Sequence, residues 1–271
     1  MNSSTEGSCY ISQAEEKTYQ DQLPKITDLV YHRVKLLTED DGMIYDHIKP
    51  ATFLERLNRF TAHIAIDGRV EKCHVKNTGR CWELLYHGAP VLVQEIAARQ
   101  RKTSYDLIAV YKGKRLVNID SSAPNRVFAE WLSQGGLFKN TTLIKPETKF
   151  GDSRFDFYVE GDGRQAFVEV KGVTLEDKGV ARFPDAPTER GIKHLKDLMR
   201  CLEAGFEAYV VFIVKMKGVI YFEPNWDTHP EFGRVLCQAA ELGVQVLALD
   251  CQVTENSITP GDPLKVVLDK K

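Results

Sequence analysis

The sequence predicts two domains of different class, a small, strongly curved β-barrel followed by an α/β domain. The chain has 271 residues, more than the roughly 100–200 residues of a typical domain. Between residues 51 and 120, five short candidate strands alternate with turn residues. After Pro124, a helical pattern followed by an unbroken apolar run occurs twice, which is typical of a sheet with helical crossovers. We therefore divide the chain into an N-terminal extension (1–44), a barrel (45–122) and an α/β domain (123–271).

The composition is that of a soluble globular protein. Hydrophobic residues make up 43% and charged residues 27% of the chain, which excludes a wholly disordered protein. No apolar run approaches the roughly 18–20 residues of a membrane span, and the polar N-terminus lacks a signal-peptide core. The six cysteines form no CxxC pair, so we expect reduced structural thiols and no zinc site. The sequence thus predicts a cytoplasmic protein with no membrane partner.

Charge is distributed unevenly along the chain, although the overall net charge is only −2. Residues 45–125 carry thirteen Lys and Arg against eight Asp and Glu, a net charge of +5. The flanking segments, 1–44 and 126–271, have net charges of −4 and −3. A basic segment of this kind is a candidate nucleic-acid footprint, and an ordinary solvated surface explains the same excess. The small overall charge argues against a histone-like polyanion binder.

The elements of the first 122 residues follow from spacing and turns. In the extension, apolar residues at helical spacing predict a short amphipathic helix over 29–37, before an acidic turn at 39–42. In the barrel, alternation from Phe60 to Ile66 followed by Asp67-Gly68 predicts a hairpin. The five expected strands are 60–66, 70–75, 90–96, 105–111 and 115–119.

The α/β domain is expected to begin with a short helix around 127–131 that ends near Gly135. A hairpin follows, and then two units in which a helix precedes a buried strand. The unbroken apolar runs of these units are typical of central strands in a parallel sheet. The expected elements are strands 154–159 and 166–171, helix 188–204, strand 208–214, helix 230–242 and strand 244–249.

Two carboxylates and an ammonium group are expected to meet on this hairpin. Side chains alternate between the faces of a strand, so Phe155 and Phe157 share one face and Asp156 takes the other. In the next strand, Glu169 and Lys171 share a face. Carboxylate oxygens suit Mg²⁺ or Mn²⁺, and a neighbouring lysine orients or activates a water molecule. The alternative is an exposed sheet face with a solvated ion pair, because a short E-x-K strand occurs by chance in many proteins.

The order of elements around this hairpin resembles the PD-(D/E)XK nuclease fold. A helix carrying Glu130 precedes the strand with Asp156, the E-x-K strand, a helix and a further strand. The proline that usually precedes the aspartate is replaced by Phe155. This resemblance implies Asp156 and Glu169 as metal ligands, with Lys171 and Glu130 completing the catalytic set.

A more specific resemblance rests on six segments that occur in order along the chain. Together they resemble the sugar fermentation stimulation protein A (SfsA) family over roughly residues 48–268. The resemblance implies an OB-fold domain followed by a PD-(D/E)XK-like domain in a bacterial DNA-binding protein, with a regulatory role in maltose metabolism. The segments are Asn77-Thr78-Gly79-Arg80, Arg101-Lys102, Pro124-Asn125-Arg126, Gly151–Phe157, Val168–Lys171 and Phe183–Gly191.

Two segments of the barrel are candidate nucleic-acid contacts. Asn77, Thr78 and Arg80 surround a glycine that permits close approach to a phosphate, and an ordinary Asx-turn is the alternative. Arg101 and Lys102 lie in a basic loop just before an aromatic residue. OB folds hold single strands with basic loops and aromatic platforms, and a plain solvated loop is the alternative.

Two arginines of the α/β domain complete the predicted nucleic-acid contacts. Arg190 lies near the start of the helix that follows the segment 183–191, where a helix N-terminus favours anions. A rigid connection between strand and helix is the alternative for that segment. Arg154 is predicted beside Asp156. For His194, on the same helix as Arg190, a surface or capping role is favoured and a position facing the site is the alternative; the histidines show no metal-ligand spacing.

Two functions fit the sequence. One is a DNA-binding protein without turnover that uses the barrel and its basic loop. The other is a metal-dependent nuclease acting on DNA or RNA, favoured because a binding platform needs no complete set of Asp156, Glu169 and Lys171. The absence of a helix-turn-helix pattern argues against a sequence-specific repressor, and no residue pattern supports a sugar-metabolic enzyme. The sequence leaves substrate strandedness and oligomeric state open.

Overall fold

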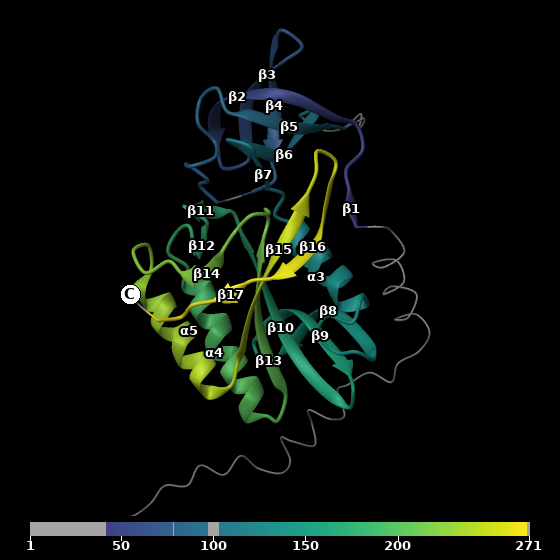
Figure 1. The fold of residues 1–271 in the computed structure, drawn as a ribbon, viewed down its shortest axis with the longest axis vertical. Coiled ribbons are helices and arrows are strands. Elements are labelled where there is room, and N and C mark those ends of the chain that lie inside the picture. Colours follow the sequence, from purple (N-terminus) through teal and green to yellow (C-terminus); the bar gives the residue numbers. More distant parts are fainter. Residues whose placement is uncertain (1–41, 78, 97–102, 270–271) are drawn as a thin grey trace, which may run out of the picture. The chain divides into compact units, whose positions relative to one another are not determined.

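The computed structural model describes residues 42–77, 79–96 and 103–269. The helix expected over 29–37 lies outside the described residues. The described chain contains a six-stranded sheet, a seven-stranded sheet and a small four-stranded sheet. Figure 1 labels the strands along the chain. None of the helices in these ranges has both the length and the apolar character needed to cross a membrane.

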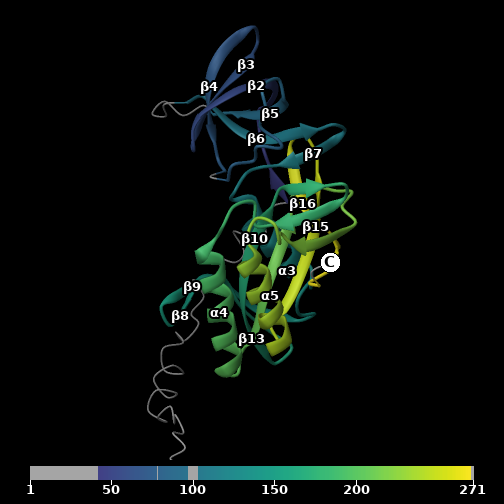
Figure 2. The same ribbon diagram turned by 90° about the vertical axis from the view of Figure 1, so that its left-hand side faces the viewer.

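The first domain is a closed β-barrel, as predicted. Its strands are β2 (Ile48–Asn58), β3 (Thr61–Ile66), β4 (Arg69–Val75), β5 (Pro90–Glu95), β6 (Tyr105–Lys112) and β7 (Arg115–Asn118). They follow the order β4-β3-β2-β5-β6-β7, and an additional parallel pairing of β4 with β6 closes the barrel (Figure 2). Alternate side chains of β3, among them Ala62, Ile64 and Ile66, are buried in its core.

Strand β2 was not expected from the sequence. It pairs with both β3 and β5, yet within its eleven residues only Phe53 is fully buried. Its third residue is Pro50, and proline argues against a central strand. The register also shifts between Phe53 and Glu55, and such an irregularity interrupts the alternation on which a strand is recognised.

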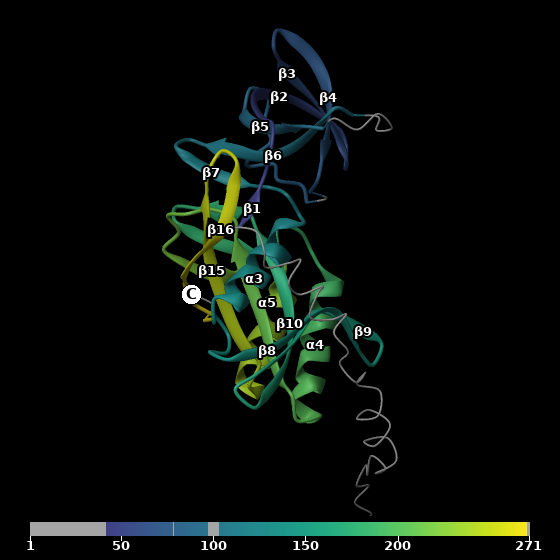
Figure 3. The same ribbon diagram turned by 90° about the vertical axis from the view of Figure 1, so that its right-hand side faces the viewer.

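The second domain is built on the seven-stranded sheet. In spatial order its strands are β1 (Met43–Ile44), β16 (Ser257–Pro263), β15 (Gln245–Val253), β13 (Glu207–Val214), β10 (Arg164–Val173), β9 (Ser153–Gly161) and β8 (Thr141–Phe150). The helices α4 (Glu189–Glu203) and α5 (Pro230–Leu242) pack against each other on one face, and α3 (Ala123–Ser133) covers the other (Figures 2 and 3). The β10–β13 and β13–β15 pairs are parallel, so the predicted sheet with helical crossovers is confirmed.

The edge of this sheet differs from the sequence-based division. Met43 and Ile44, which the sequence placed in the extension, pair with Ile258 and Ser257 of β16. Backbone pairing at a sheet edge needs no side-chain pattern, so a strand of two residues leaves no pattern in the sequence from which it could be predicted. Strand β8 was also missed, because its sequence is largely polar and contains Pro146. The small sheet, likewise unexpected, consists of β11 (Leu175–Asp177), β12 (Val180–Phe183), β14 (Tyr221–Pro224) and β17 (Lys265–Val266).

A buried carboxylate links the barrel to the second domain. The Glu176 side chain of β11 is 5% exposed and accepts from Lys112 Nζ at 2.8 Å and from Arg115 Nη1 at 2.6 Å. The backbone N–H of Gly179 donates to its other oxygen at 2.5 Å. Burial alone would raise the pKa of Glu176, but the hydrogen bonds from Lys112 and Arg115 outweigh burial and lower the pKa from 4.5 to about 2.

Replacing Glu176 with glutamine is expected to lower the free energy of unfolding at neutral pH by about 3 kcal/mol, since each pKa unit corresponds to about 1.4 kcal/mol. The folded pKa lies below the unfolded one, so this stabilisation is complete above about pH 4.5 and is lost as the pH falls through about 2. Urea unfolding of wild type and variant at about pH 7 and about pH 3 measures the effect. An equal difference at both pH values would contradict the ion-pair explanation.

Candidate functional site

Glu169 and Lys171 lie on β10, in the middle of the seven-stranded sheet and on the face covered by α4. Lys171 Nζ donates a hydrogen bond to Glu169 Oε1, as expected for residues two apart on a strand. The Glu169 residue is only 3% exposed, whereas the Lys171 side chain keeps 16% of its surface. A buried carboxylate therefore faces an ammonium group that solvent can reach.

Asp156 is held beside this pair by two hydrogen bonds from different elements. The backbone N–H of Val170 donates to Asp156 Oδ2 at 2.8 Å, and the Asn125 amide of α3 donates to Oδ1 at 2.9 Å. Burial raises the pKa of Asp156, and the charge of Glu169 raises it further. The structure thus brings Asp156, Glu169 and Lys171 together, as the hairpin reasoning expected.

The pairing of β9 with β8 is interrupted at Asp156, and the expected faces of the neighbouring aromatic residues are corrected accordingly. Phe155 packs 6.2 Å from the ring of His194 on α4, whereas Phe157 packs 5.3 Å from Phe128 on α3. The two phenylalanines therefore contact helices on opposite faces of the sheet, not one shared face. Pairing between β8 and β9 skips Asp156, and Glu147, the residue opposite, has a left-handed φ of 52°. Simple alternation fails at such an interruption.

His194 is part of this site, which corrects its interpretation as a surface or capping residue. It is 6% exposed, and its Nδ1 is hydrogen-bonded to Glu169 Oε1. Arg190 Nε donates to His194 Nε2 at 3.3 Å. Arginine has no acceptor atom, so this contact places a donor against Nε2 and leaves Nδ1 to donate to Glu169. The imidazole thereby orients Glu169, and Arg190 in turn orients the imidazole.

Glu169 has the electrostatic character of an ionised ligand. Burial by itself raises the pKa of Glu169, but the hydrogen bond from His194 and the charge of Lys171 outweigh it and hold the pKa below its ordinary value. Its second oxygen, Oε2, is buried and has no hydrogen-bond partner. A buried carboxylate oxygen without a partner is costly, and a bound cation would satisfy it.

The donor set fits a hard divalent cation. In the described part of the chain, no group of three or more His, Cys, Asp or Glu side chains is arranged to hold a metal ion. Asp156 and Glu169 offer carboxylate oxygens only. Mg²⁺ commonly binds proteins through one or two carboxylates and keeps water or substrate phosphates as its other ligands. The pair, with the unpartnered Glu169 Oε2, meets that requirement.

The structure does not bring Glu130 to this pair. Its side chain receives a hydrogen bond from Gln134 at 3.3 Å, and Oε2 lies 3.5 Å from where a Cβ on Gly42 would stand. Asn125 lies five residues earlier on α3, about 7.5 Å along the helix axis, and it is Asn125 that contacts Asp156. Asn125 lies in the segment Pro124-Asn125-Arg126, but nothing in the local sequence pattern indicated that it contacts Asp156.

Comparisons with known proteins agree with this architecture. Residues 54–119 match the family described as "SfsA N-terminal OB domain", and residues 122–257 match "Sugar fermentation stimulation protein RE domain". The "Sugar fermentation stimulation protein homolog" of Desulfitobacterium hafniense (strain Y51) is 58% identical over 226 residues, which cover 83% of this chain and 99% of the relative. The chain belongs to the SfsA family.

Further SfsA relatives extend the comparison. The homolog of Clostridium beijerinckii is 52% identical over 226 residues, covering 83% of this chain and all of that protein. Among solved structures, Pyrococcus furiosus SfsA in complex with Ca²⁺ has a TM-score of 0.76 and 28% sequence identity, and it covers 84% of this chain and 100% of its own. These likenesses support the arrangement of an OB-fold barrel followed by an α/β domain.

Four of the predicted nucleic-acid contacts of this SfsA-family chain lie among the described residues. Asn77 forms an Asx-turn, with Oδ1 accepting from the Gly79 N–H at 2.8 Å. The Arg80, Arg154 and Arg190 residues are exposed, although Arg154 lies 3.5 Å from Glu147. Thr78, Arg101 and Lys102 lie outside the described residues, so their role stays a prediction.

Sequence reasoning missed Arg56, which shapes this turn. From β2 its guanidinium donates to the carbonyl oxygens of Asn77 (2.5 Å), Gly79 (2.6 Å) and Arg80 (3.1 Å). It also donates to Arg59 O at 2.7 Å. A guanidinium presents several donors in a rigid plane, so one side chain fixes the backbone of the turn. Nothing in the sequence of β2 indicates this role.

Proposed function

We propose that this SfsA-family chain is a nuclease that depends on a divalent cation, Mg²⁺ or Mn²⁺, and hydrolyses phosphodiester bonds of DNA or RNA. The observation that carries the proposal is the buried Glu169 carboxylate. One of its oxygens is held by Lys171 and His194, and the other lacks a partner. Asp156 stands beside it as a second oxygen ligand. A carboxylate pair next to a lysine is the arrangement that metal-assisted hydrolysis needs.

Each residue of the site has a separate task in this reaction. Asp156 and Glu169 would hold the cation, which supplies positive charge against the charge that develops on the phosphoryl group. Lys171 donates to the attacking water and orients it toward phosphorus. Water then adds across the phosphodiester, which yields a phosphate monoester and a hydroxyl. His194 keeps Glu169 oriented.

The relatives support the cation requirement. Pyrococcus furiosus SfsA is described in complex with Ca²⁺, a hard cation that prefers oxygen ligands as Mg²⁺ does. Ca²⁺ commonly supports binding where Mg²⁺ supports turnover, so it serves here as a probe of binding. A regulatory role in maltose metabolism, implied by the family resemblance, stays a prediction for which the site offers no argument.

The barrel supports a nucleic-acid substrate. Besides the turn held by Arg56, it presents Trp82 and Tyr86, which are 73% and 52% exposed. Their neighbours Leu84 and Leu85 are buried, so the segment 82–86 is anchored while its two aromatic rings face solvent. Exposed aromatic rings beside basic side chains suit unpaired bases and phosphates. Binding of this kind is sequence-independent and weakens with salt.

The test is cleavage of labelled single- and double-stranded DNA and RNA by wild type and by Asp156→Asn, with Mg²⁺, Mn²⁺, Ca²⁺ or EDTA. We expect cleavage by wild type only, with Mg²⁺ or Mn²⁺, because the variant keeps the size of Asp156 and one of its two acceptor oxygens but loses its charge. Cleavage that persists in EDTA would contradict the metal requirement. Binding of DNA without cleavage under any condition would instead support the other function, a DNA-binding protein without turnover.

A further inference from the structure

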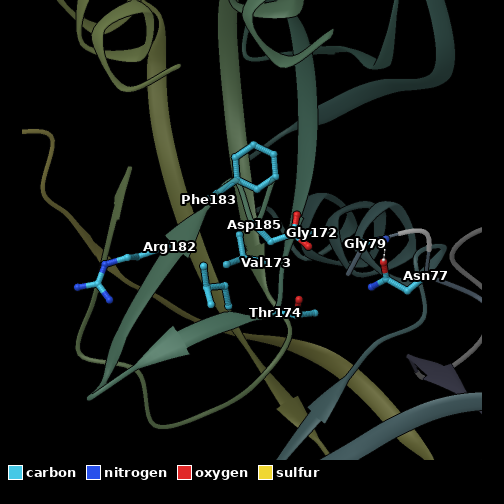
Figure 4. A pocket seen from close by; sticks show the side chains of 9 residues that line it. Asn77, Gly79, Gly172, Val173, Thr174, Arg182, Phe183 and Asp185 are labelled. Atoms are coloured by element: carbon cyan, nitrogen blue, oxygen red, sulfur yellow. Dashed lines mark hydrogen bonds between the residues drawn. The ribbon is translucent and has the colours of Figure 1, made fainter. Parts of the chain in front are cut away.

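A cavity of about 250 Å³ opens beside the end of β10. Gly172, which follows Lys171 on β10, and Thr174, just beyond the end of the strand, form one wall. The barrel turn contributes Asn77 and Gly79, and the loop after β12 contributes Asp185. Figure 4 shows these groups around a common space, with the Phe183 ring at one side. The cavity therefore begins one residue beyond the predicted catalytic lysine.

The groups facing this cavity are suited to hydrogen bonds with a ligand. In the described part of the chain, no residue donates a hydrogen bond or forms an ion pair with the Asp185 carboxylate. The Asn77 amide uses its oxygen for the Gly79 N–H and so presents its NH₂ group. Thr174 adds a hydroxyl, and Phe183 adds the edge of an aromatic cluster with Phe212 and Phe232.

Charge shows which part of a nucleotide fits here. Arg182 also borders the cavity, but it pairs with Glu223 at 2.8 Å, and its guanidinium points away from the other side chains (Figure 4). Among the described residues that line the cavity, the charge without an ion-pair partner is the Asp185 carboxylate, which repels a phosphate and accepts from N–H groups. Nucleobases present such donors, and aspartate accepts from the cytosine amino group in known readout.

We propose that this cavity binds one unpaired nucleobase adjacent to the phosphodiester being cleaved, with Asp185 accepting from its N–H donors. The proposal rests on the proposed nuclease function and adds a substrate class, single-stranded or locally unpaired nucleic acid. A volume of about 250 Å³ lies just below the roughly 300–1,000 Å³ of pockets for drug-sized ligands, which suits a single base. Enzymes that read an extruded base combine hydrogen bonds to its edge with aromatic contact.

Gly79 offers a way to fill the cavity without strain on the backbone. A Cβ at this position would stand 2.7 Å from Asp185 Oδ2 and 2.9 Å from Asn77 Oδ1. Both atoms are the ends of side chains, so they can move aside and the fold is retained. The φ of Gly79 is outside the left-handed region, so alanine is compatible with it. Gly79→Ala therefore displaces the two polar groups that we assign to the base.

The experiment maps every cut in a single-stranded oligonucleotide that carries one abasic residue, with Mg²⁺ present. In wild type, we expect cleavage of the bond next to the abasic residue to fall about tenfold relative to the other bonds, since stacking and hydrogen bonding to one base are lost. In Asp185→Asn and Gly79→Ala this suppression should largely disappear. The exposed residue Asp177 supplies the matched control, because Asp177→Asn removes an equal charge outside the cavity and should retain the suppression.

The outcomes separate this inference from the proposed function. Cleavage by wild type with no suppression at the abasic residue overturns the base pocket and leaves the nuclease proposal standing. Suppression that persists in both Asp185→Asn and Gly79→Ala also overturns it, because the base is then read elsewhere. If wild type cuts no bond of any oligonucleotide, the proposed function fails and the inference falls with it.

Discussion

Replacing Glu169 with glutamine is expected to weaken Mn²⁺ binding by more than about 100-fold and to reduce cleavage to background. Glutamine keeps the shape of the side chain and an acceptor for His194 and Lys171, so the fold is retained. What is lost is half of the carboxylate pair and the anionic oxygen that has no other partner. Removing a residue that only orients a metal ligand lowers metal affinity by about 10–100-fold. Glu169 is itself assigned as a ligand, so its replacement is expected to cost more.

Isothermal titration calorimetry with Mn²⁺ measures the first effect and thermal unfolding checks the fold. Glu203→Gln is the matched control, because Glu203 is exposed at the end of α4 and far along the helix from His194. Alanine is a poorer choice than glutamine, because it would leave the donors of His194 and Lys171 without an acceptor. Mn²⁺ affinity that is equal in wild type and Glu169→Gln would refute the assignment of the metal site.

Lys171→Met is expected to lower the single-turnover cleavage rate by about 10²–10³-fold while Mn²⁺ affinity stays the same or rises slightly. Removing one oriented donor that stabilises a transition state typically costs a factor of that size. An ammonium orients a nucleophile but does not ligate a cation. Its removal also frees Glu169 Oε1 from one hydrogen bond. Methionine keeps the apolar stem that packs against the strand.

The cleavage rate, the Mn²⁺ affinity and the nucleic-acid affinity need to be measured on the same preparation of each variant. Nucleic-acid affinity measured with Ca²⁺ should be nearly unchanged, since binding is assigned to the barrel and the cavity. Lys196→Met serves as control, because Lys196 is exposed on α4. Loss of Mn²⁺ binding in Lys171→Met would mean that the lysine holds the site together and does not act on the water. If neither protein cleaves but both bind DNA, the enzyme proposal fails.

Much of the site could be predicted because it depends on neighbours in sequence. Glu169 and Lys171 share a face since they are two apart on one strand, and Asp156 comes near them since β9 and β10 form a hairpin. The buried strands β13 and β15 were recognised for a similar reason, because an unbroken apolar run reports burial on both faces. The start of α4 is equally local, because the hydroxyl of Thr188 accepts from the Gly191 N–H at 3.0 Å and caps the helix.

The expectations that failed depend on contacts between distant segments. Glu130 was placed with the carboxylates because it lies on the preceding helix, but the rotation of α3 against the sheet turns Asn125 toward Asp156 instead. His194 is separated from Glu169 by 25 positions, and no local pattern indicates that α4 lays it over β10. Phe155 and Phe157 were given one face because alternation assumes a regular strand, and the pairing of β9 with β8 is interrupted between them.

The sequence by itself determined the two domains, the hairpin and the three residues Asp156, Glu169 and Lys171, because periodicity and pairing within a hairpin are local properties. Only the tertiary structure decided which groups surround them. The donors that hold Asp156 and Glu169, the Arg56 contacts that shape the barrel turn, and the cavity lined by Asp185 all join segments far apart in the chain. Their proximity follows from how helices pack on the sheet and how the barrel docks beside β10, and these contacts are set by burial across the whole chain.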